Sequence, residues 1–345
     1  MPPSPYDTKT AIPFPLTTGD FPALGLANIS RRLDNAPFPN CLPSPSNKGM
    51  SMAATLGCIA GEEIHLQWNA GQIEGESLGR KSTPFGESGD IFRIHAGDVP
   101  FYLLARWGSG MEKSAPHRTN SRANLYALKD LGTDCVLGWG PGGAITHNIS
   151  VGDLVILSDL MDMTHLRDAT FFEDVPLGQL RQFPVFCPQL RQMIGKVMED
   201  MKLIHHGTGT AAVREGPRLE TPAEVRMLIT IGAEIVTHTF VPEMFLAKEL
   251  QMGYAAVCYV VNYAETGSRY QPFAPGGLFG NLTDESERDR GAGAVDAVTR
   301  IASNLAGQVA NLDTSKCSPC KTQTEHIREY DLPADWREWF KHRKR

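Results

Sequence analysis

Long apolar runs are missing from this chain of 345 residues. One of the longest, residues 254–261, is far shorter than the ~20 residues that a membrane-spanning helix needs. The N-terminus also lacks the basic and apolar segments that are typical of a signal peptide. The sequence therefore predicts no membrane partner and a cytoplasmic location.

The chain also lacks an excess of positive charge. Its 33 Lys and Arg residues are outnumbered by 39 Asp and Glu residues, so the net charge is −6 and the pI is about 5.9. Nucleic-acid-binding domains usually carry a basic surface, so this balance argues against a nucleic-acid partner. The seven cysteines are an odd number scattered along a large chain, which is typical of reduced thiols in the cytoplasm.

Complete sets of metal ligands are absent at the usual spacings. Cys317 and Cys320 form one CxxC pair, but neither a second pair nor a His pair follows at the spacing of a zinc finger. His205 and His206 are adjacent and have no further ligand in the pattern. We therefore expect no metal ion and no organic cofactor.

What the sequence contains is a long α/β pattern between two polar ends. Residues 1–50 are rich in Pro and Ser and predict an extended, partly disordered extension, and residues 313–345 form a polar tail. Residues 53–312 alternate short apolar segments with helical periods, which predicts a single α/β domain with a twisted mixed β-sheet flanked by helices. The expected strands are residues 56–60, 101–105, 135–137, 154–157 and 255–261, and the expected helices are residues 122–131, 189–201, 222–231, 243–251 and 292–312.

A turn followed by a helix start is the most informative local pattern. Gly216 and Pro217 predict a turn, because Gly allows a positive φ and Pro fixes φ. Thr221 is suited to the N-cap, and Glu224 completes a capping box with it. Glu220 is thus expected at the carboxyl end of a strand, which is where open α/β sheets bind small ligands.

Several short motifs resemble the purine nucleoside phosphorylase and methylthioadenosine phosphorylase family. They appear in the family's order between residues 56 and 262. They are Leu56-Gly57-Cys58-Ile59-Ala60-Gly61, Thr83-Pro84-Phe85-Gly86, Leu103-Leu104-Ala105-Arg106, Pro116-His117 with Asn120 and Arg122-Ala123-Asn124, Val151-Gly152-Asp153-Leu154-Val155, Asp162 with Thr164, Gly216-Pro217-Arg218-Leu219-Glu220, Gly232-Ala233-Glu234, and Val241-Pro242-Glu243. The resemblance implies cleavage of the N-glycosidic bond of a purine nucleoside, inorganic phosphate as a possible co-substrate, and a homotrimer.

The resemblance assigns Glu220, Leu219 and Asn262 to the purine. A carboxylate at position 220 accepts N–H groups of the base, and a neutral amide at position 262 suits a 6-oxopurine, where relatives for 6-aminopurines carry Asp. Asn262 also counts as a catalytic residue, because it contacts the departing base. The alternative for Glu220 is a solvated acid at a helix start, attracted by the helix dipole.

Two histidines are assigned to the sugar by the resemblance. His238 stands where relatives carry a Met beneath the ribose. His117 is the candidate for a contact on the 5′ side of the ribose in a neighbouring subunit, and the alternative for it is a structural role. The substituent on the 5′ carbon stays open and includes methylthio.

The residues that hold phosphate in the family are only partly kept. Arg106 and Thr239 are retained as anion-binding candidates, but Trp107 replaces a His, and residues 139–144 replace a turn that supplies hydroxyls. Aligning the first glycine loop places Glu62 on a hydroxyl position, unless the alignment is shifted by one residue. Phosphorolysis is the family default. The alternatives are a nucleoside hydrolase with Glu62 as general base, and a catalytically silent binding or assembly protein.

Overall fold

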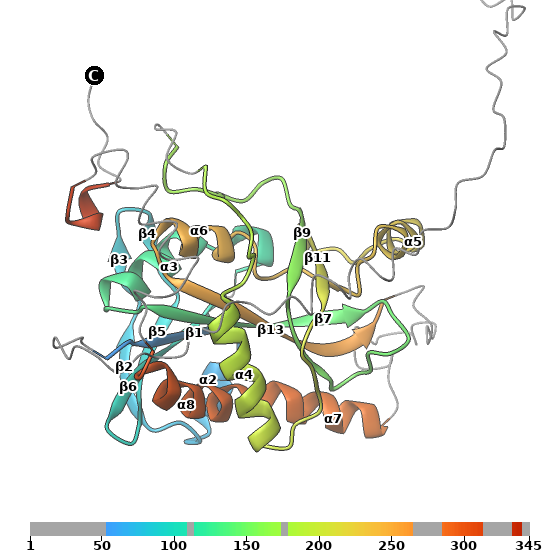
Figure 1. The fold of residues 1–345 in the computed structure, drawn as a ribbon, viewed down its shortest axis with the longest axis horizontal. Helices are drawn as coiled ribbons and strands as arrows, with labels where there is room; N and C mark the ends of the chain where they lie inside the picture. Colours follow the sequence, from blue (N-terminus) through green and yellow to red (C-terminus); the bar gives the residue numbers. More distant parts are fainter. Residues whose placement is uncertain (1–52, 109–113, 174–178, 265–284, 313–332, 340–345) are drawn as a thin grey trace, which may run out of the picture. The chain divides into compact units, whose positions relative to one another are not determined.

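The computed structural model describes residues 53–108, 114–173, 179–264, 285–312 and 333–339. A large mixed sheet runs in the order β10-β8-β13-β7-β1-β6-β5-β2, and β9, β11 and β12 extend it beside β7 (Figure 1). The strands of this sheet are β1 (Leu56–Ala60), β2 (Gly75–Gly79), β5 (Asp90–Ala96), β6 (Val99–Ala105), β7 (Cys135–Ala144), β8 (Leu154–Ile156), β9 (Asp159–Met163), β10 (His205–His206), β11 (Thr210–Arg214), β12 (Ile235–Thr237) and β13 (Gly253–Tyr263). β3 (Ser82–Thr83) and β4 (Gly86–Glu87) pair separately.

Helices cover both faces of the sheet (Figure 1). They are α2 (Glu63–Asn69), α3 (Ser121–Asp130), α4 (Pro188–Asp200), α5 (Pro222–Thr230), α6 (Glu243–Glu249), α7 (Glu285–Asp296) and α8 (Val298–Val309), with 3₁₀ turns η2 (Pro116–Arg118) and η4 (Trp336–Glu338). One core cluster joins the sheet to α4 and α8, and the other joins it to α3 and α6. The expected α/β fold, a mixed sheet flanked by helices, is confirmed.

The central strands are apolar in long stretches because both of their faces are buried. β1 is buried throughout and pairs in parallel with β6 and β7, while β13 pairs in parallel with β7. Parallel strands covered by helices on both sides need apolar residues at successive positions rather than at alternate ones. This is why the strand at residues 254–261 reads as a continuous apolar run.

Two expected elements differ from the structure by more than a few residues at their ends. β7 is ten residues long rather than three, because its glycines and Pro141 continue the strand. A Cβ on Gly140 would lie 2.5 Å from Oγ1 of Thr239, so a strand glycine is required at this close approach. The single helix expected at residues 292–312 is wrong: α7 and α8 meet at Ala297, whose N–H bonds to the carbonyl of Ala294.

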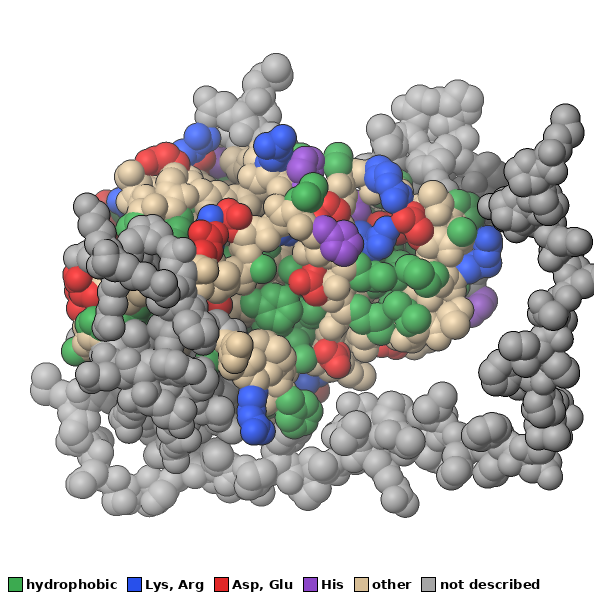
Figure 2. Space-filling model, turned by 90° about the horizontal axis from the view of Figure 1, so that it is seen from above, with side chains coloured by type: hydrophobic (Ala, Val, Ile, Leu, Met, Phe, Trp, Pro, Cys, Tyr) green, Lys and Arg blue, Asp and Glu red, His purple; other side chains and the backbone are tan. Residues whose placement is uncertain are grey.

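The two ends of the chain are described only in part. The extension expected at residues 1–50 and the pair Cys317 and Cys320 lie outside the described residues. In the polar tail, η4 lies against α3, where Arg337 donates to Asp130 at 2.8 Å. None of the helices in the described ranges has the length and apolarity needed to cross a membrane. On the face seen in Figure 2, acidic, basic and His side chains are interspersed around hydrophobic ones.

Candidate active site

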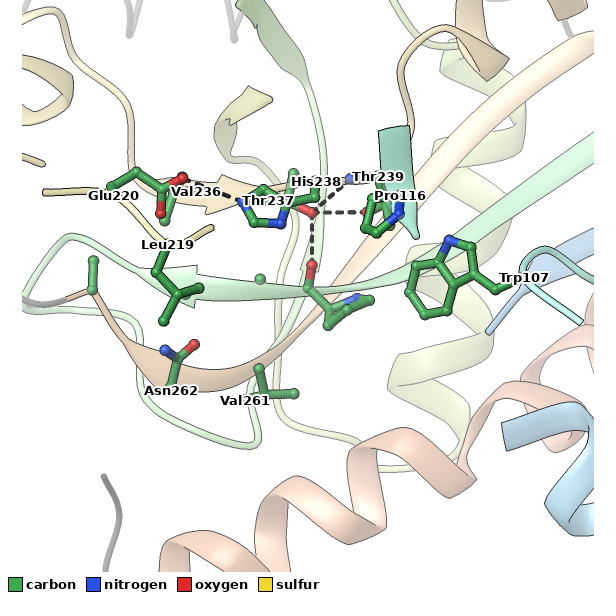
Figure 3. A pocket seen from close by; sticks show the side chains of 14 residues that line it. Trp107, Pro116, Leu219, Glu220, Val236, Thr237, His238, Thr239, Val261 and Asn262 are labelled. Carbon is green, nitrogen blue, oxygen red and sulfur yellow. Dashed lines mark hydrogen bonds and ion pairs between the residues drawn. The ribbon is translucent and has the colours of Figure 1, made fainter. Parts of the chain in front are cut away.

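A pocket of about 360 Å³ opens where the carboxyl ends of β7 and β13 meet the chain that follows β12 (Figure 3). Ligand sites of open α/β sheets are found at such strand ends. The lining residues are Trp107, Pro116, Pro141, Gly142, Gly143, Leu219, Glu220, Val236, Thr237, His238, Thr239, Val261, Asn262 and Ala264. Five of the residues expected from the sequence line it together: Leu219, Glu220, His238, Thr239 and Asn262.

Asn262 enters the pocket from an irregular part of β13. The register with β7 shifts between Val260 and Asn262, so both Val261 and Asn262 line the pocket. Asn262 is 8% exposed. A Cβ on Gly143 would lie 3.1 Å from Oδ1 of Asn262, so the glycine on the neighbouring strand leaves room for the amide.

Glu220 is a pocket residue and not a solvated acid at a helix start. It is 8% exposed, and its Oε1 lies 3.3 Å from Nε2 of His238 and 4.0 Å from Nε of Arg214. The acid in the first turn of α5 is Glu224, and its carboxylate accepts the N–H of Thr221 in the expected capping box. Hydrogen bonding from Arg218, together with the Thr221 N–H, lowers the pKa of Glu224 to about 2.

His238, which the resemblance assigned to the ribose, lies beside Glu220, which the resemblance assigned to the purine. Because its partner Glu220 is an acceptor when ionised, Nε2 of His238 carries the hydrogen of their contact. Nδ1 lies on the side of the turn, where a Cβ on Gly216 would come within 2.8 Å of it. Gly216 also has φ +68°, so both its backbone and its surroundings require glycine. His238 thus connects the turn to the Glu220 carboxylate.

His117 is half-buried in η2 and is not among the residues that line the pocket in this single chain. Its neighbour Pro116 does line the pocket. The structure therefore brings the segment of His117 to the pocket rim, while the contact across a subunit boundary stays a prediction. Within the described residues, no three His, Cys, Asp or Glu side chains gather to hold a metal ion.

Thr239 belongs to a hydroxyl chain that the sequence did not reveal. Oγ1 of Thr237 donates to the carbonyl of Pro141 at 2.7 Å and lies 2.8 Å from Oγ1 of Thr239. A hydroxyl has one hydrogen, so Thr237 must accept from Thr239 in this arrangement. Figure 3 shows this chain along the pocket wall opposite Val261 and Asn262. The Thr239 hydroxyl is therefore directed to its neighbour.

Arg106 is paired inside the protein, contrary to its expected role in an open anion site. It is 4% exposed and is not among the lining residues. Its Nε and Nη2 donate to the two oxygens of Glu243, Nη1 donates to the carbonyl of Trp139 at 2.9 Å, and Nη2 also reaches the carbonyl of Ile59 at 3.1 Å. Burial alone would lower the pKa of Arg106, but the charge and hydrogen bonds of Glu243 outweigh it and raise this pKa.

The acid of the glycine loop is Glu63 rather than Glu62. Glu62 is half-buried at the N-cap of α2 and is not among the residues that line the pocket. Glu63 is 5% exposed, and its Oε1 accepts the N–H of Gly61 at 2.8 Å. A Cβ on Gly61 would lie 2.6 Å from Oε2 of Glu63 and 2.9 Å from Cζ3 of Trp107. Of the two neighbouring acids, Glu63 is therefore the one buried against the glycine loop.

Comparison with known proteins identifies the family. Residues 62–305 match the Phosphorylase superfamily, so the chain belongs to this family. A probable 6-oxopurine nucleoside phosphorylase of Dictyoglomus turgidum is 40% identical over 185 residues, which are 53% of this chain and 69% of that protein. A probable S-methyl-5′-thioinosine phosphorylase of Methanothermobacter thermautotrophicus is 35% identical over 61% of this chain and 71% of its own length.

Solved structures support the same fold. Methylthioadenosine phosphorylase from Schistosoma mansoni, in complex with tubercidin, superposes with a TM-score of 0.68 and 24% identity. The match covers 80% of this chain and 98% of that one. At this identity the likeness concerns the fold alone. The resemblance to nucleoside phosphorylases that the motifs indicated is confirmed at the level of the family.

Proposed function

We propose that this protein cleaves the N-glycosidic bond of a purine nucleoside and prefers a 6-oxopurine base. The observation that carries this proposal is that Glu220 and Asn262, 42 positions apart in the sequence, line one pocket. The relatives named 6-oxopurine nucleoside phosphorylase and S-methyl-5′-thioinosine phosphorylase support it. Both of those names refer to 6-oxopurine chemistry.

The two side chains offer complementary groups to such a base. A 6-oxopurine carries a hydrogen on N1 and a carbonyl oxygen at C6. The Glu220 carboxylate can accept the N1 hydrogen, and the Asn262 amide can donate to O6 or N7. Donation to N7 also stabilises the negative charge that gathers on the base as it departs, and this gives Asn262 its catalytic role.

The remaining walls suit a sugar with an apolar 5′ substituent. Trp107, Pro116 and Val261 contribute apolar surface to the pocket, and His238 supplies a polar group. This supports a 5′-modified nucleoside, such as a methylthio-nucleoside, besides the unmodified one. The cytoplasmic homotrimer, with His117 of one subunit close to the ribose of another, remains part of the proposal and rests on the family resemblance. Sedimentation analysis tests the oligomeric state.

Two molecules are candidates for accepting the sugar when the glycosidic bond breaks: inorganic phosphate and water. The names of the relatives support inorganic phosphate, and phosphorolysis is the default reaction of the family. The second candidate is water, which would make the protein a nucleoside hydrolase with Glu62 as general base, but Glu62 is not among the residues that line the pocket. In a catalytically silent relative, the base would bind but no nucleoside would be cleaved.

Release of the free base from inosine, guanosine and 5′-methylthioinosine tests the proposal. We expect hypoxanthine or guanine to appear at a rate proportional to enzyme concentration, measured by chromatography with and without phosphate. Adenosine serves as the matched 6-aminopurine. Binding of hypoxanthine without cleavage of any of these nucleosides would contradict the enzymatic reading and favour a binding protein.

Replacing Asn262 by Asp is expected to reverse the base preference. The carboxylate cannot donate to O6, whereas its protonated form can donate to N7 and accept from the 6-amino group. We expect kcat/KM for inosine to fall by at least about tenfold, a loss of about 1.4 kcal/mol, relative to that for adenosine. Asn304→Asp on α8 makes the same change at an exposed position. An unchanged ratio of inosine to adenosine in Asn262→Asp would contradict the assignment.

A further inference from the structure

Glu220 presents its two carboxylate oxygens to different surroundings. Oε1 lies 3.3 Å from Nε2 of His238 and 4.0 Å from Nε of Arg214. Among the residues that the structure describes, Oε2 has no hydrogen-bond partner. Figure 3 shows one oxygen facing His238 and the other turned away from it, toward the side on which Leu219 and Asn262 lie. The protein therefore holds one oxygen of this carboxylate and leaves the other to a ligand.

The ring of His238 is held in place through its backbone and through its own surroundings. The neighbouring Thr237 and Thr239 are buried, and the N–H of Thr239 donates to Oγ1 of Thr237 at 3.2 Å, while that hydroxyl donates to a carbonyl on β7. The ring itself lies against Gly216, where an added Cβ would come within 2.8 Å of Nδ1 and 3.1 Å of Cγ. Because both the backbone and the ring are constrained, Nε2 stays beside Oε1 of Glu220.

Arg214 is the weaker partner of the same oxygen. Its Nη2 donates to Oε1 of Glu224, so its guanidinium is shared between two carboxylates. Its distance of 4.0 Å from Oε1 of Glu220 is that of an ion pair without a hydrogen bond. Within the described part of the chain, His238 is thus the residue whose side chain donates a hydrogen bond to Glu220.

The 6-oxopurine bases differ in the number of hydrogens that they present to such a carboxylate. Hypoxanthine presents one, on N1. Guanine presents a second one on the adjacent 2-amino group, and these two parallel N–H groups match the two oxygens of a carboxylate that has no other partner. When His238 occupies Oε1, the 2-amino group loses its water without gaining an acceptor, or it must displace the histidine, and either event costs free energy.

We propose that His238, by holding Oε1 of Glu220, makes this pocket select hypoxanthine nucleosides over guanine nucleosides. This inference rests on the proposed cleavage of a 6-oxopurine nucleoside, and it narrows the substrate to inosine and its 5′-modified forms. His238 acts here as a positioning residue, because it determines which oxygen of Glu220 the base can reach. The Met that the family resemblance places at this position in relatives has no N–H to donate to a carboxylate.

Binding of the free bases tests this selection without any need for catalysis. Hypoxanthine and guanine differ only in the 2-amino group, and quenching of tryptophan fluorescence can follow both at micromolar concentration, since Trp107 lines the pocket. We expect the wild-type protein to bind hypoxanthine at least about tenfold more tightly than guanine, which corresponds to about 1.4 kcal/mol. Equal affinities, or tighter binding of guanine, would overturn the inference.

Two substitutions of His238 separate the effect of its hydrogen bond from that of its shape. His238→Met removes the donor and releases Oε1 of Glu220, whereas His238→Gln keeps an N–H that can donate to this oxygen. We expect the ratio of hypoxanthine to guanine affinity to fall about tenfold in His238→Met and to stay within about threefold of the wild-type ratio in His238→Gln. An unchanged ratio in His238→Met, or an equal loss in both variants, would overturn the role of His238.

Competition between inosine and guanosine in one reaction separates this inference from the proposed function. Faster release of hypoxanthine than of guanine from an equimolar mixture would support the selection, because the ratio of the two rates equals the ratio of kcat/KM. Cleavage of both nucleosides at equal rates would overturn the role of His238 and leave the proposed function intact. A wild-type protein that binds neither base and cleaves neither nucleoside would overturn both.

Discussion

Glu220→Gln is expected to lower kcat/KM for inosine by about 100-fold and to weaken hypoxanthine binding by a similar factor. A hydrogen bond to a charged group contributes about 1.5–3 kcal/mol, and 1.4 kcal/mol corresponds to a tenfold change. Gln is isosteric, and its amide oxygen can still accept from Nε2 of His238, so the fold around the turn should be retained. What is lost is the carboxylate that, in the proposed function, accepts the N1 hydrogen of the base.

The ratio of the affinity for hypoxanthine to the affinity for adenine separates a loss of base recognition from general damage to the protein. Hypoxanthine has a hydrogen on N1 and adenine does not, so Glu220→Gln should reduce the preference for hypoxanthine measured by calorimetry. Glu199→Gln on α4 is the control, because it makes the same substitution at an exposed carboxylate that is not among the pocket residues. If Glu220→Gln and Glu199→Gln bind both bases like the wild-type protein, the purine assignment is wrong.

The position of Glu220 at the pocket could be predicted from the sequence because the geometry that places it is largely local. The turn at Gly216 and the capping box of Thr221 and Glu224 are encoded within ten residues, and together they place Glu220 in front of α5. Asn262 was identified through the family resemblance, and the structure places it near the carboxyl end of β13, in the same pocket.

The anion side could not be predicted in the same way because it depends on distant pairs. Arg106 and Glu243 are 137 positions apart, and no local pattern indicates that they neutralise each other. Thr237 was missed for a related reason: its partner is the carbonyl of Pro141 on another strand. Glu62 and Glu63 differ by one position in a short loop, and only the direction of the first turn of α2 decides which of them is buried.

The helix bounds also divide into those set by neighbouring residues, which the sequence predicts, and those set by distant contacts, which it does not. α5 begins where its capping box predicts, and its start depends on three neighbouring residues. The break between α7 and α8 carries no glycine or proline at Ala297 itself, and the apolar pattern continues across it. Packing against the sheet, which is a tertiary effect, decides where such a helix is interrupted.

Glu243→Ala is expected to lower the free energy of unfolding by about 3–5 kcal/mol, because it leaves the guanidinium of Arg106 buried without its counter-charge. Both side chains are buried, so the water that would otherwise solvate the charge cannot reach it without opening the structure. Arg106 also holds the carbonyls of Ile59 on β1 and Trp139 on β7, so its displacement would disturb the centre of the sheet.

Denaturant unfolding of three variants separates the charge effect from lost packing. Tyr254→Phe removes only the hydroxyl that donates to Oε2 of Glu243 at 2.9 Å, so we expect a loss of about 1–2 kcal/mol. The double variant Arg106→Met with Glu243→Leu replaces the pair by apolar side chains and should recover most of the stability lost in Glu243→Ala, because no unpaired charge remains. A double variant less stable than Glu243→Ala would show that the two carbonyl contacts of Arg106, rather than its pairing with Glu243, dominate at this position.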